Sequence, residues 1–325
     1  MTHVAIIGMG LIGTSLGMAL RSATDTPLGE VTVTGFDREA RNVSEARARL
    51  AIDREARGIG EALRDAQIVV LAVPVQAVHE VLQAIGPLLA AGTIVTDVCS
   101  TKAQVVQWAR ESLPSSVDFV GGHPMAGREI SGPAGASPDL FRDAIYCLTP
   151  DVTVREEALA AVEAMARQVG AKPYFIDPVE HDSYVAGISH LPFLLSTALV
   201  QVTASSPGWT EMSPLAASGY RDMSRLAAGD TAMHRDICMT NRESIARWLD
   251  ETARELIVMR DQVAAGDEAA LTALFDRARA TREAWLVSRP NTRPGEEEVE
   301  RQHAALYEQP TFLGRFGLGG PRRKR

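Results

Sequence analysis

The sequence predicts an α/β protein: a doubly wound sheet in the N-terminal half, followed by an all-helical C-terminal part. Three observations carry this prediction. Short apolar, β-branched segments alternate with helical patterns through the first 175 residues, and strand patterns stop near Val179, where long helical patterns begin. A glycine-rich turn follows the first strand pattern. Alternation of this kind is typical of a parallel sheet with helices on both faces.

Seven segments are short and mostly apolar throughout, as expected for strands buried on both faces. They are Val4–Ile7, Val31–Phe36, Ile68–Val73, Thr93–Val98, Phe119–Gly121, Ala144–Leu148 and Pro173–Ile176. Helical patterns lie between them, near residues 12–22, 39–50, 76–90, 101–112 and 155–169. We therefore assign residues 1–177 to the first domain.

The second half is predicted to be helical, over Val179–Ser205, Pro214–Ala227, Ala232–Val263 and Glu268–Ser288. The segment Leu191–Val200 is apolar nearly all round, which indicates a buried helix that Pro192 starts or kinks. A buried helix in so small a domain often packs against its copy in a second subunit. We therefore expect residues 178–289 to form a substrate and dimerisation domain, and the protein to be a homodimer.

The last stretch, residues 290–325, is rich in proline, glycine and charge. It is predicted to be a tail, with one short helix near Glu296–Tyr307.

Composition excludes several classes of protein. Of 325 residues, 46% are hydrophobic, which is ample for packed cores, and the net charge of -8 argues against general nucleic-acid binding. The three cysteines, Cys99, Cys147 and Cys238, form no paired motif, which predicts neither a disulfide framework nor a metal site. No secretion signal or membrane-spanning apolar run is expected, so a cytoplasmic protein is predicted.

The glycine-rich turn predicts a dinucleotide site of the Rossmann type. The first strand pattern runs into Gly8-x-Gly10-x-x-Gly13, and a helical pattern follows. Gly8 permits the tight turn, Gly10 lets the backbone approach the pyrophosphate, and Gly13 lets helix and strand pack closely. The helix N-terminus then presents amides to the phosphates. The predicted cofactor contacts in this turn are Gly8, Met9, Gly10, Leu11, Ile12 and Gly13.

Asp37 closes the second strand pattern, where an acidic residue accepts hydrogen bonds from the adenosine ribose hydroxyls. Its charge would repel a 2′-phosphate, so NAD is favoured over NADP, although the adjacent Arg38 could soften that preference. Val73 and Pro74 end the third long strand pattern and are expected beside the adenosine–ribose part of the cofactor. For Val73 and Pro74, an ordinary strand-ending proline is an equally good interpretation.

Three segments carry chemistry: Thr96–Lys102, Gly121–Gly127 and Ser189–Pro192. Together with the glycine-rich turn they resemble the prephenate/arogenate dehydrogenase family, and the resemblance covers residues 3 to 288. The string Gly-Gly-His-Pro-Met-Ala-Gly in the second segment is a specific match. So is Gly219–Ala227, with Arg235-Asp236-Ile237 following it.

The resemblance implies NAD-dependent oxidative decarboxylation of prephenate to 4-hydroxyphenylpyruvate, a step of tyrosine biosynthesis. Hydride leaves the ring for the nicotinamide, the ring hydroxyl loses its proton and carbon dioxide departs. Aromatisation drives the decarboxylation, so no metal is required. The protein must supply a base at the hydroxyl, a partner that orients it, and cations for two carboxylates.

The family's roles map onto residues of this chain. His123 is the implied base, which agrees with an imidazole that titrates near neutral pH. Ser100 is the implied partner of the substrate hydroxyl, and it could also cap the helix that begins near Thr101. Arg225 is the implied carboxylate clamp. The remaining implied substrate contacts are Arg221, Glu129, His190 and His181, of which the two histidines could instead be structural bridges between the domains.

The exact substrate stays open. Some relatives that use prephenate carry a second histidine three residues after the first, in Ser-His-Leu-Pro-His, whereas this chain has Phe193 there. Arogenate and 4-amino-4-deoxyprephenate are therefore alternative substrates.

Two other classes of protein fit the sequence less well. Dehydrogenases of the β-hydroxyacid or 6-phosphogluconate type use a lysine in the first long helix of the second domain, but Val179–Ser205 contains none. A non-enzymatic NAD-binding regulatory module would leave His123, Ser100 and Arg225 unexplained.

Overall fold

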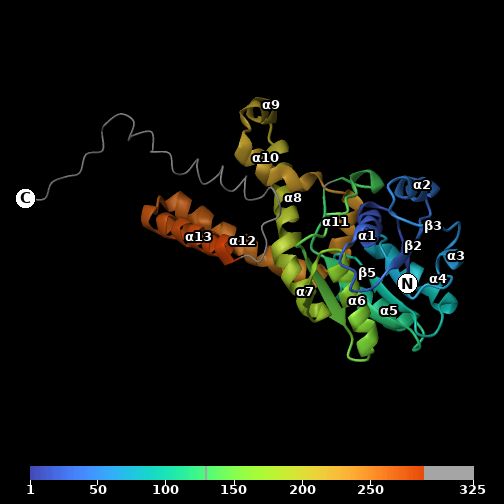
Figure 1. Cartoon of the computed structure of the whole chain (residues 1–325). Coiled ribbons are helices and arrows are strands. Elements are labelled where there is room, and N and C mark those ends of the chain that lie inside the picture. Colours follow the sequence, from blue (N-terminus) through green and yellow to red (C-terminus); the bar gives the residue numbers. More distant parts are fainter. Residues whose placement is uncertain (129, 289–325) are drawn as a thin grey trace, which may run out of the picture. The chain divides into compact units, whose positions relative to one another are not determined.

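The computed structural model describes residues 1–128 and 130–288 (Figure 1). One sheet of eight strands has the order β3-β2-β1-β4-β5-β6-β7-β8. Neighbouring strands are parallel except β6 and β7, which run antiparallel. The strands are β1 (Thr2–Ile7), β2 (Val31–Phe36), β3 (Arg54–Glu55), β4 (Ile68–Leu71), β5 (Ile94–Asp97), β6 (Asp118–Pro124), β7 (Ile145–Pro150) and β8 (Lys172–Phe175).

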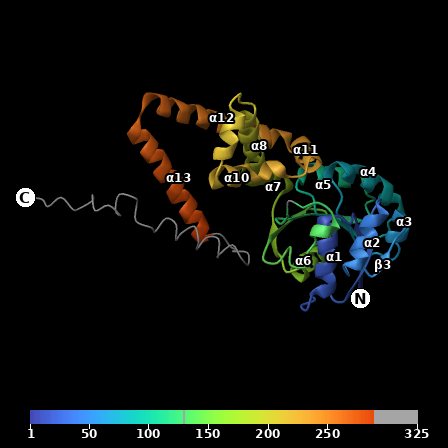
Figure 2. The ribbon, with the colours of Figure 1, turned by 90° about the horizontal axis from the view of Figure 1, so that it is seen from above.

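Helices cover both faces of this sheet. They are α1 (Leu11–Ser22), α2 (Ala40–Ala48), α3 (Ile59–Ala62), α4 (Val75–Ile85), α5 (Ala103–Ser112) and α6 (Glu156–Gln168). In β1, Val4 and Ile6 belong to a core with α1, α2 and α6, whereas Ala5 and Ile7 belong to a second core with α3, α4 and α5. Figure 2 shows α1 and α6 on one side of the sheet and α4 and α5 on the other. The predicted doubly wound α/β fold is confirmed.

The seven expected strands are all present: β2 has the expected bounds, and the ends of the other six differ by one to three residues. The sequence missed β3, whose two residues are exposed and pair with Thr34 and Gly35 of β2. A strand this short has no apolar pattern to detect. It extends the sheet only because β2 offers a free edge.

The most consequential difference is the length of β6. It was expected over Phe119–Gly121 but spans Asp118–Pro124. Its pairing with β5 ends at Val120, and the remaining residues pair with β7, with His123 opposite Cys147. His123 therefore lies in a strand that continues beyond the carboxyl end of β5, which is the edge where parallel sheets bind ligands.

The second half of the described chain is helical, as expected, but it is more divided than the sequence indicated. Its elements are α7 (Pro178–Val185), a π-helical turn η3 (Ala186–His190), α8 (Leu191–Ala204), α9 (Trp209–Met212), α10 (Ser218–Ser224), a 3₁₀ turn η5 (Arg225–Ala228), α11 (Thr231–Thr240) and α12 (Arg242–Ala265). The helix expected over Ala232–Val263 breaks at Asn241, whose side chain bonds to Asp182 and His190 instead. That tertiary contact has no local sequence signal.

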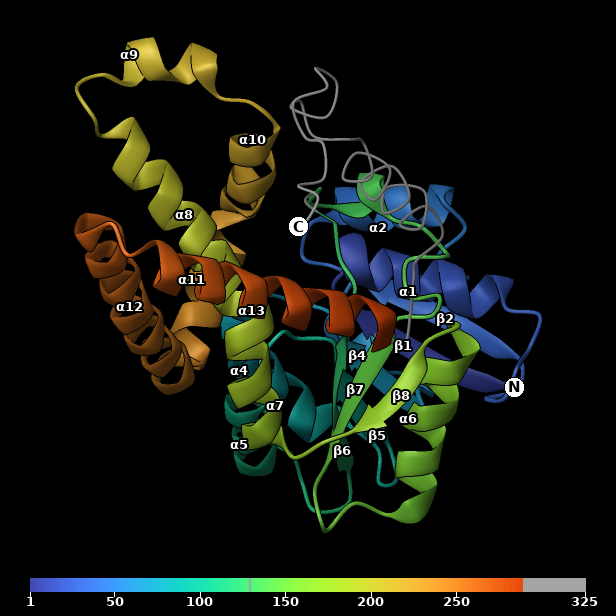
Figure 3. The same cartoon turned by 90° about the vertical axis from the view of Figure 1, so that its left-hand side faces the viewer.

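Pro178–Ala204 forms one helical stretch that is long and apolar enough, by length and composition alone, to span a membrane. The expectation that no apolar run reaches this length was therefore wrong. The expectation that Leu191–Val200 is buried was also too strong for the single chain, because only Phe193 and Ser196 of α8 are buried. Figure 3 shows the reason: α10 runs back beside α8 and covers only part of it.

Packing divides the described chain into two compact units, Met1–Gly266 and a second that begins at Asp267. The expected domain boundary at residue 177 separates sheet from helices within the first unit, and as a domain boundary it stays a prediction. The described part of the second unit is α13 (Glu268–Ser288), which has the bounds expected. The predicted tail at 290–325, with its short helix, lies outside the described residues.

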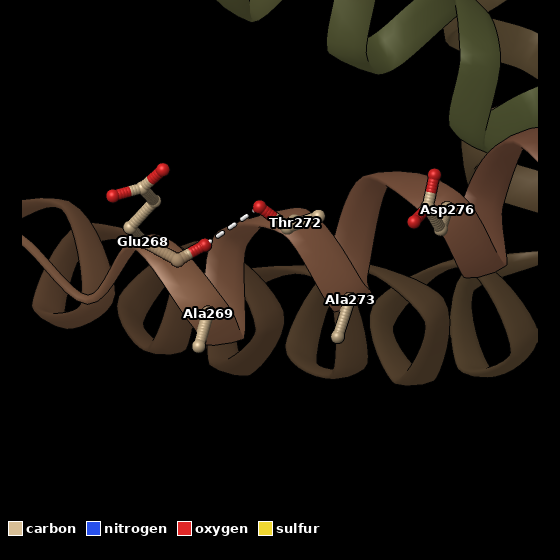
Figure 4. Close-up of a pocket in the computed structure, with 5 residues that line it drawn as sticks. All are labelled: Glu268, Ala269, Thr272, Ala273 and Asp276. Atoms are coloured by element: carbon tan, nitrogen blue, oxygen red, sulfur yellow. Dashed lines mark hydrogen bonds between the residues drawn. The ribbon is translucent and has the colours of Figure 1, made fainter. Parts of the chain in front are cut away.

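A hollow on α13 is formed by one helix alone. It is lined by Glu268, Ala269, Thr272, Ala273 and Asp276 (Figure 4). Its drawn hydrogen bond, from Thr272 Oγ1 to the Glu268 carbonyl oxygen at 2.8 Å, is internal to the helix. The hollow gathers no groups from separate elements and so brings together no set of side chains for chemistry.

Candidate active site

The glycine-rich turn has the geometry that a dinucleotide requires. Gly8 has φ +102°, and a Cβ there would lie 2.3 Å from the Ala72 carbonyl oxygen. A Cβ on Gly13 would lie 1.9 Å from the Gly8 carbonyl oxygen, so α1 can approach β1 only because this position has no side chain. A Cβ on Gly10, by contrast, meets nothing within 4 Å. Gly8 and Gly13 are therefore demanded by packing, whereas Gly10 faces open space where a pyrophosphate fits.

The N-terminus of α1 is open to an anion. The helix begins at Leu11, has no acidic residue in its first turn and receives no side-chain cap from Gly10. Unpaired amides and the positive end of the helix dipole make such a terminus an anion site. Val73 lies beside this turn, since a Cβ on Gly8 would be 3.1 Å from the Val73 backbone nitrogen. Pro74 immediately precedes α4 as its N-cap residue.

Asp37 stands at the end of β2 in a fixed orientation. One carboxylate oxygen accepts a hydrogen bond from the Met9 amide at 2.8 Å, and the other from the Glu39 amide at 2.8 Å. These bonds hold the carboxylate against the glycine-rich turn, where it fits an adenosine ribose. The neighbouring Arg38 side chain is 90% exposed and lies 3.8 Å from Glu39.

A buried ion pair supports the loop that follows β5. The side chains of Lys102 and Asp97 are both 0% exposed and bonded to each other. Lys102 Nζ also donates to the Gly122 carbonyl oxygen at 2.7 Å. Asp97 accepts from the amides of Gly122 at 3.1 Å and Cys99 at 2.9 Å. The pair therefore links the end of β5 to the part of β6 that precedes His123.

His123 is buried and connected to the helical half. Its Nδ1 lies 2.9 Å from Nε2 of His181, and the two rings meet edge to face with centroids 5.1 Å apart. His181 Nδ1 lies 2.8 Å from Oδ1 of Asp182. Asp182 in turn accepts from the backbone amides of Lys102 at 2.7 Å and Ala103 at 2.9 Å. A row of hydrogen bonds thus runs from β6 through α7 to the start of α5.

Burial lowers the pKa of His123 well below its usual value of 6.5, and the nearby His181, Lys102 and His190 lower it further. Desolvation disfavours the charged imidazolium, and so do the Lys102 ammonium and the neighbouring rings that could themselves take up a proton. The ring is therefore neutral at neutral pH. A neutral imidazole in a buried site is suited to accept a proton.

His181 has both ring nitrogens hydrogen-bonded within the protein and is 1% exposed. This is the structural bridge between sheet and helices that the sequence left open, and it leaves His181 no nitrogen for a substrate. His190 differs. Its Nδ1 lies 3.3 Å from the Asn241 side-chain nitrogen, while its Nε2 is buried without a partner. Burial lowers the pKa of His190 to about 4, so it too is neutral.

A fourth histidine near this group was missed by the sequence reasoning. His234 of α11 stacks on Phe193 with centroids 4.1 Å apart and an angle of 2° between planes. An imidazole from another helix therefore lies directly against the Phe193 ring. Only the tertiary packing of α11 on α8 brings the two rings together.

Ser100 is half-buried in the loop between β5 and α5. The alternative that it caps the following helix is wrong, because α5 begins at Ala103 and receives no cap from its own flanking side chains. Asp182, 80 residues further along the chain, supplies the cap instead. Ser100 therefore does not cap α5.

The two arginines are not part of the buried histidine group. Arg221 of α10 pairs with the adjacent Asp222 at 3.3 Å, and both side chains are exposed. Arg225 begins η5, is exposed, and lies in a turn that packs on α8. Their substrate-binding roles stay predictions. Glu129, the remaining predicted contact, lies outside the described residues.

The glycine geometry predicts opposite outcomes for two alanine substitutions. Gly13→Ala should lower the free energy of unfolding by about 2–3 kcal/mol, because the new methyl group collides with backbone. Gly10→Ala should leave the unfolding temperature within about 2 °C but weaken NAD binding at least tenfold, because its methyl enters only the open space. Thermal unfolding and fluorescence titration with NAD separate the two. Equal NAD affinity in Gly10→Ala and the unaltered protein would contradict this placement of the pyrophosphate.

Comparison with known proteins agrees with this geometry. The family model for the prephenate dehydrogenase nucleotide-binding domain matches residues 19–175, and that for the prephenate dehydrogenase dimerization domain matches residues 177–277. Prephenate dehydrogenase of Bacillus subtilis is 32% identical over 86% of this chain and 75% of its own length. Cyclohexadienyl dehydrogenase of Zymomonas mobilis is 31% identical over 82% of this chain and 89% of its own length.

Solved structures give the same result. Prephenate dehydrogenase from A. aeolicus, in complex with hydroxyphenyl propionate and NAD+, has a TM-score of 0.81 at 26% identity and covers 87% of this chain and 98% of its own. Synechocystis arogenate dehydrogenase has a TM-score of 0.74 at 30% identity, covering 87% of this chain and all of its own. With the glycine-rich turn and the matched domains, the chain belongs to the prephenate dehydrogenase family and is an NAD-dependent dehydrogenase.

Proposed function

We propose that this enzyme converts prephenate to 4-hydroxyphenylpyruvate by oxidative decarboxylation, with His123 as the base. The observation that carries the proposal is a neutral, buried imidazole at the carboxyl edge of the sheet, on the strand that extends beyond β5. Relatives named prephenate dehydrogenase in Bacillus subtilis and Lactococcus lactis, at 32% and 31% identity, support this substrate.

NAD bound at the glycine-rich turn supplies the acceptor for the hydride that leaves the substrate ring. The chain's own residues prepare the other half of the reaction. In this proposal His123 takes the proton of the ring hydroxyl and Ser100 hydrogen-bonds that hydroxyl. The observation that Ser100 does not cap α5 supports its part. Arg225, with Arg221 one turn earlier, provides guanidinium groups for the carboxylates, which they bind through paired hydrogen bonds.

The neighbourhood of His190 bears on the choice among substrates. The buried Nε2 of His190 has no hydrogen-bond partner and offers one hydrogen bond to a ligand. His234, which stacks on Phe193, offers a second imidazole. Two neutral imidazoles suit the keto side chain of prephenate, because a neutral ring can donate to a carbonyl oxygen. Arogenate carries an ammonium group there, and a Synechocystis relative with 30% identity is named for it, so arogenate is the second candidate.

The test is reduction of NAD, followed by absorbance, with prephenate, arogenate and 4-amino-4-deoxyprephenate in parallel. We expect prephenate to give the highest kcat/KM, by at least tenfold, and NAD to exceed NADP because Asp37 opposes a 2′-phosphate. Preference for arogenate would replace the substrate but keep the reaction. Turnover of none of the three would reject the proposed function.

Replacing the base should remove turnover without removing cofactor. His123→Asn is expected to lower kcat by about 10²–10⁴-fold with the affinity for NAD unchanged. Because the pKa of His123 is lowered, the base is already unprotonated at pH 6.5, and kcat of the unaltered enzyme should fall only at a distinctly lower pH. Near-normal turnover by His123→Asn, or an acid limb centred at or above pH 6.5, would contradict His123 as the base.

We further propose that the protein is a soluble, cytoplasmic homodimer joined through its helical half. Residues 177–277 match a dimerization domain, and this half leaves apolar side chains in water: Ile188 is 72% exposed, Val202 75% and Met223 63%. Within one chain, most of the apolar helix α8 is not buried. Contact with a second copy would bury this surface. Light scattering should give twice the chain mass, and Val202→Glu should shift it toward the monomer. A monomeric unaltered protein would overturn this arrangement.

A further inference from the structure

The row of hydrogen bonds behind His123 determines which of its two nitrogens is the base. The row ends at Asp182, whose Oδ1 accepts from the Lys102 amide and whose Oδ2 accepts from the Ala103 amide. Both carboxylate oxygens thus act as acceptors at the N-terminus of α5. An aspartate carboxylate has no hydrogen to donate, so it is an acceptor toward His181 as well.

The state of His181 follows from that of Asp182. Its Nδ1 lies 2.8 Å from Asp182 Oδ1, and since a charged carboxylate cannot donate, this nitrogen carries the hydrogen. In a neutral imidazole the other nitrogen, Nε2, then has a free lone pair. That lone pair accepts a hydrogen bond from Nδ1 of His123 at 2.9 Å. His123 consequently carries its hydrogen on Nδ1, and its Nε2 is the nitrogen with the free lone pair.

We propose that His181 and Asp182 are positioning residues that hold His123 in its Nδ1–H tautomer and so leave Nε2 as the proton acceptor. This rests on the proposed role of His123 as the base. The substrate hydroxyl proton goes to Nε2, and the electron pair of its O–H bond stays on the substrate oxygen. The resulting imidazolium still donates from Nδ1 to His181, whose own N–H points at the Asp182 carboxylate. The new positive charge is thus stabilised through two hydrogen bonds.

In this proposal the tautomer of His123 also depends on the position of α7 against the sheet. His123 belongs to the sheet, whereas His181 and Asp182 belong to α7 and are 1% and 3% exposed. Asp182 is held at both ends, by the amides that begin α5 and by Asn241, whose side chain donates to its backbone carbonyl at 2.7 Å. The same carboxylate therefore caps a helix of the sheet half and fixes the tautomer of the base. A displacement of α7 would undo both.

The direct test is the tautomer of His123 in the full-length protein without substrate. Long-range ¹H–¹⁵N correlation spectra of histidine side chains distinguish a protonated from an unprotonated ring nitrogen. The His123 signals are assigned by their loss in His123→Asn. Nδ1–H with an unprotonated Nε2 is expected, and Nε2–H would overturn the proposal. Because no turnover is needed, this result stands even if all three substrates fail and the proposed function is rejected.

The kinetic test compares two substitutions of His181. His181→Gln keeps a side-chain oxygen that can accept from His123 and should retain kcat within about tenfold. His181→Leu removes the acceptor, frees the ring to adopt either tautomer and should lower kcat about 100-fold or more, with NAD affinity unchanged. Equal kcat losses in the two variants would count against the tautomer role.

A double variant separates positioning from mere structural support. In the His123→Asn background, adding His181→Leu should change the residual rate less than about threefold, because His181 acts only through His123. Multiplying losses would overturn the proposal. The matched control is Asp177→Ala, which removes the N-cap of the same helix, where the Asp177 side chain accepts from the amides of Val179 and Glu180. It should destabilise the protein by a comparable structural route and yet keep kcat within about threefold.

Discussion

The side chains of Lys102 and Asp97 are completely buried and form an ion pair. The carboxyl edge of the sheet, next to β5 and β6, is packed around this pair. Taking two charges out of water is costly, and their mutual attraction offsets that cost only when the remaining donors and acceptors are also satisfied. Here they are: Lys102 reaches the Gly122 carbonyl oxygen, and Asp97 receives the amides of Gly122 and Cys99. Removal of either partner would leave an uncompensated buried charge at the point where β5 meets β6.

Close packing at the same edge explains the two glycines that precede His123. A Cβ on Gly122 would lie 2.5 Å from the Asp97 carbonyl oxygen, and one on Gly121 would lie 2.3 Å from Thr149 Oγ1 and 3.5 Å from Cδ of Lys102. Neither position has room for a side chain between β5 and β7. The backbone that leads to His123 is therefore packed against its neighbours on both sides, and the imidazole emerges from a rigid strand. Preorganisation of this kind is what a positioned proton acceptor requires.

Two helix N-termini at this edge have opposite uses. The N-terminus of α1 is left without a side-chain cap and is open to the phosphates of NAD, while that of α5 is occupied by the carboxylate of Asp182. The first gives the cofactor its anion site. The second anchors α7 to the sheet half and so brings His181 against His123. One physical principle, the affinity of exposed amides for negative charge, thereby serves both binding and assembly.

The sequence by itself determined the fold class and the glycine-rich turn before α1, whose individual cofactor contacts stay predictions. Parallel strands buried on both faces produce continuous apolar runs, and Val31–Phe36 was found with its correct bounds for that reason. Gly8, Gly10, Gly13 and Asp37 could also be found in the sequence, because the backbone conformation of a turn depends on residues that are close together in the chain. The specific string around His123 identified the family and the candidate base. Ser100, Arg221 and Arg225 were identified by resemblance, and their roles in binding stay predictions.

Only the tertiary structure decided how His123 is held. His123 and His181 are 58 residues apart in the chain, and Lys102 and Asp182 are 80 apart. No local pattern links such positions, because each contact exists only after α7 has docked onto the sheet. The break of the long C-terminal helix at Asn241 and the stacking of His234 on Phe193 have the same origin. Periodicity reports which face of an element is buried, but the partner that buries it is set by packing between distant segments.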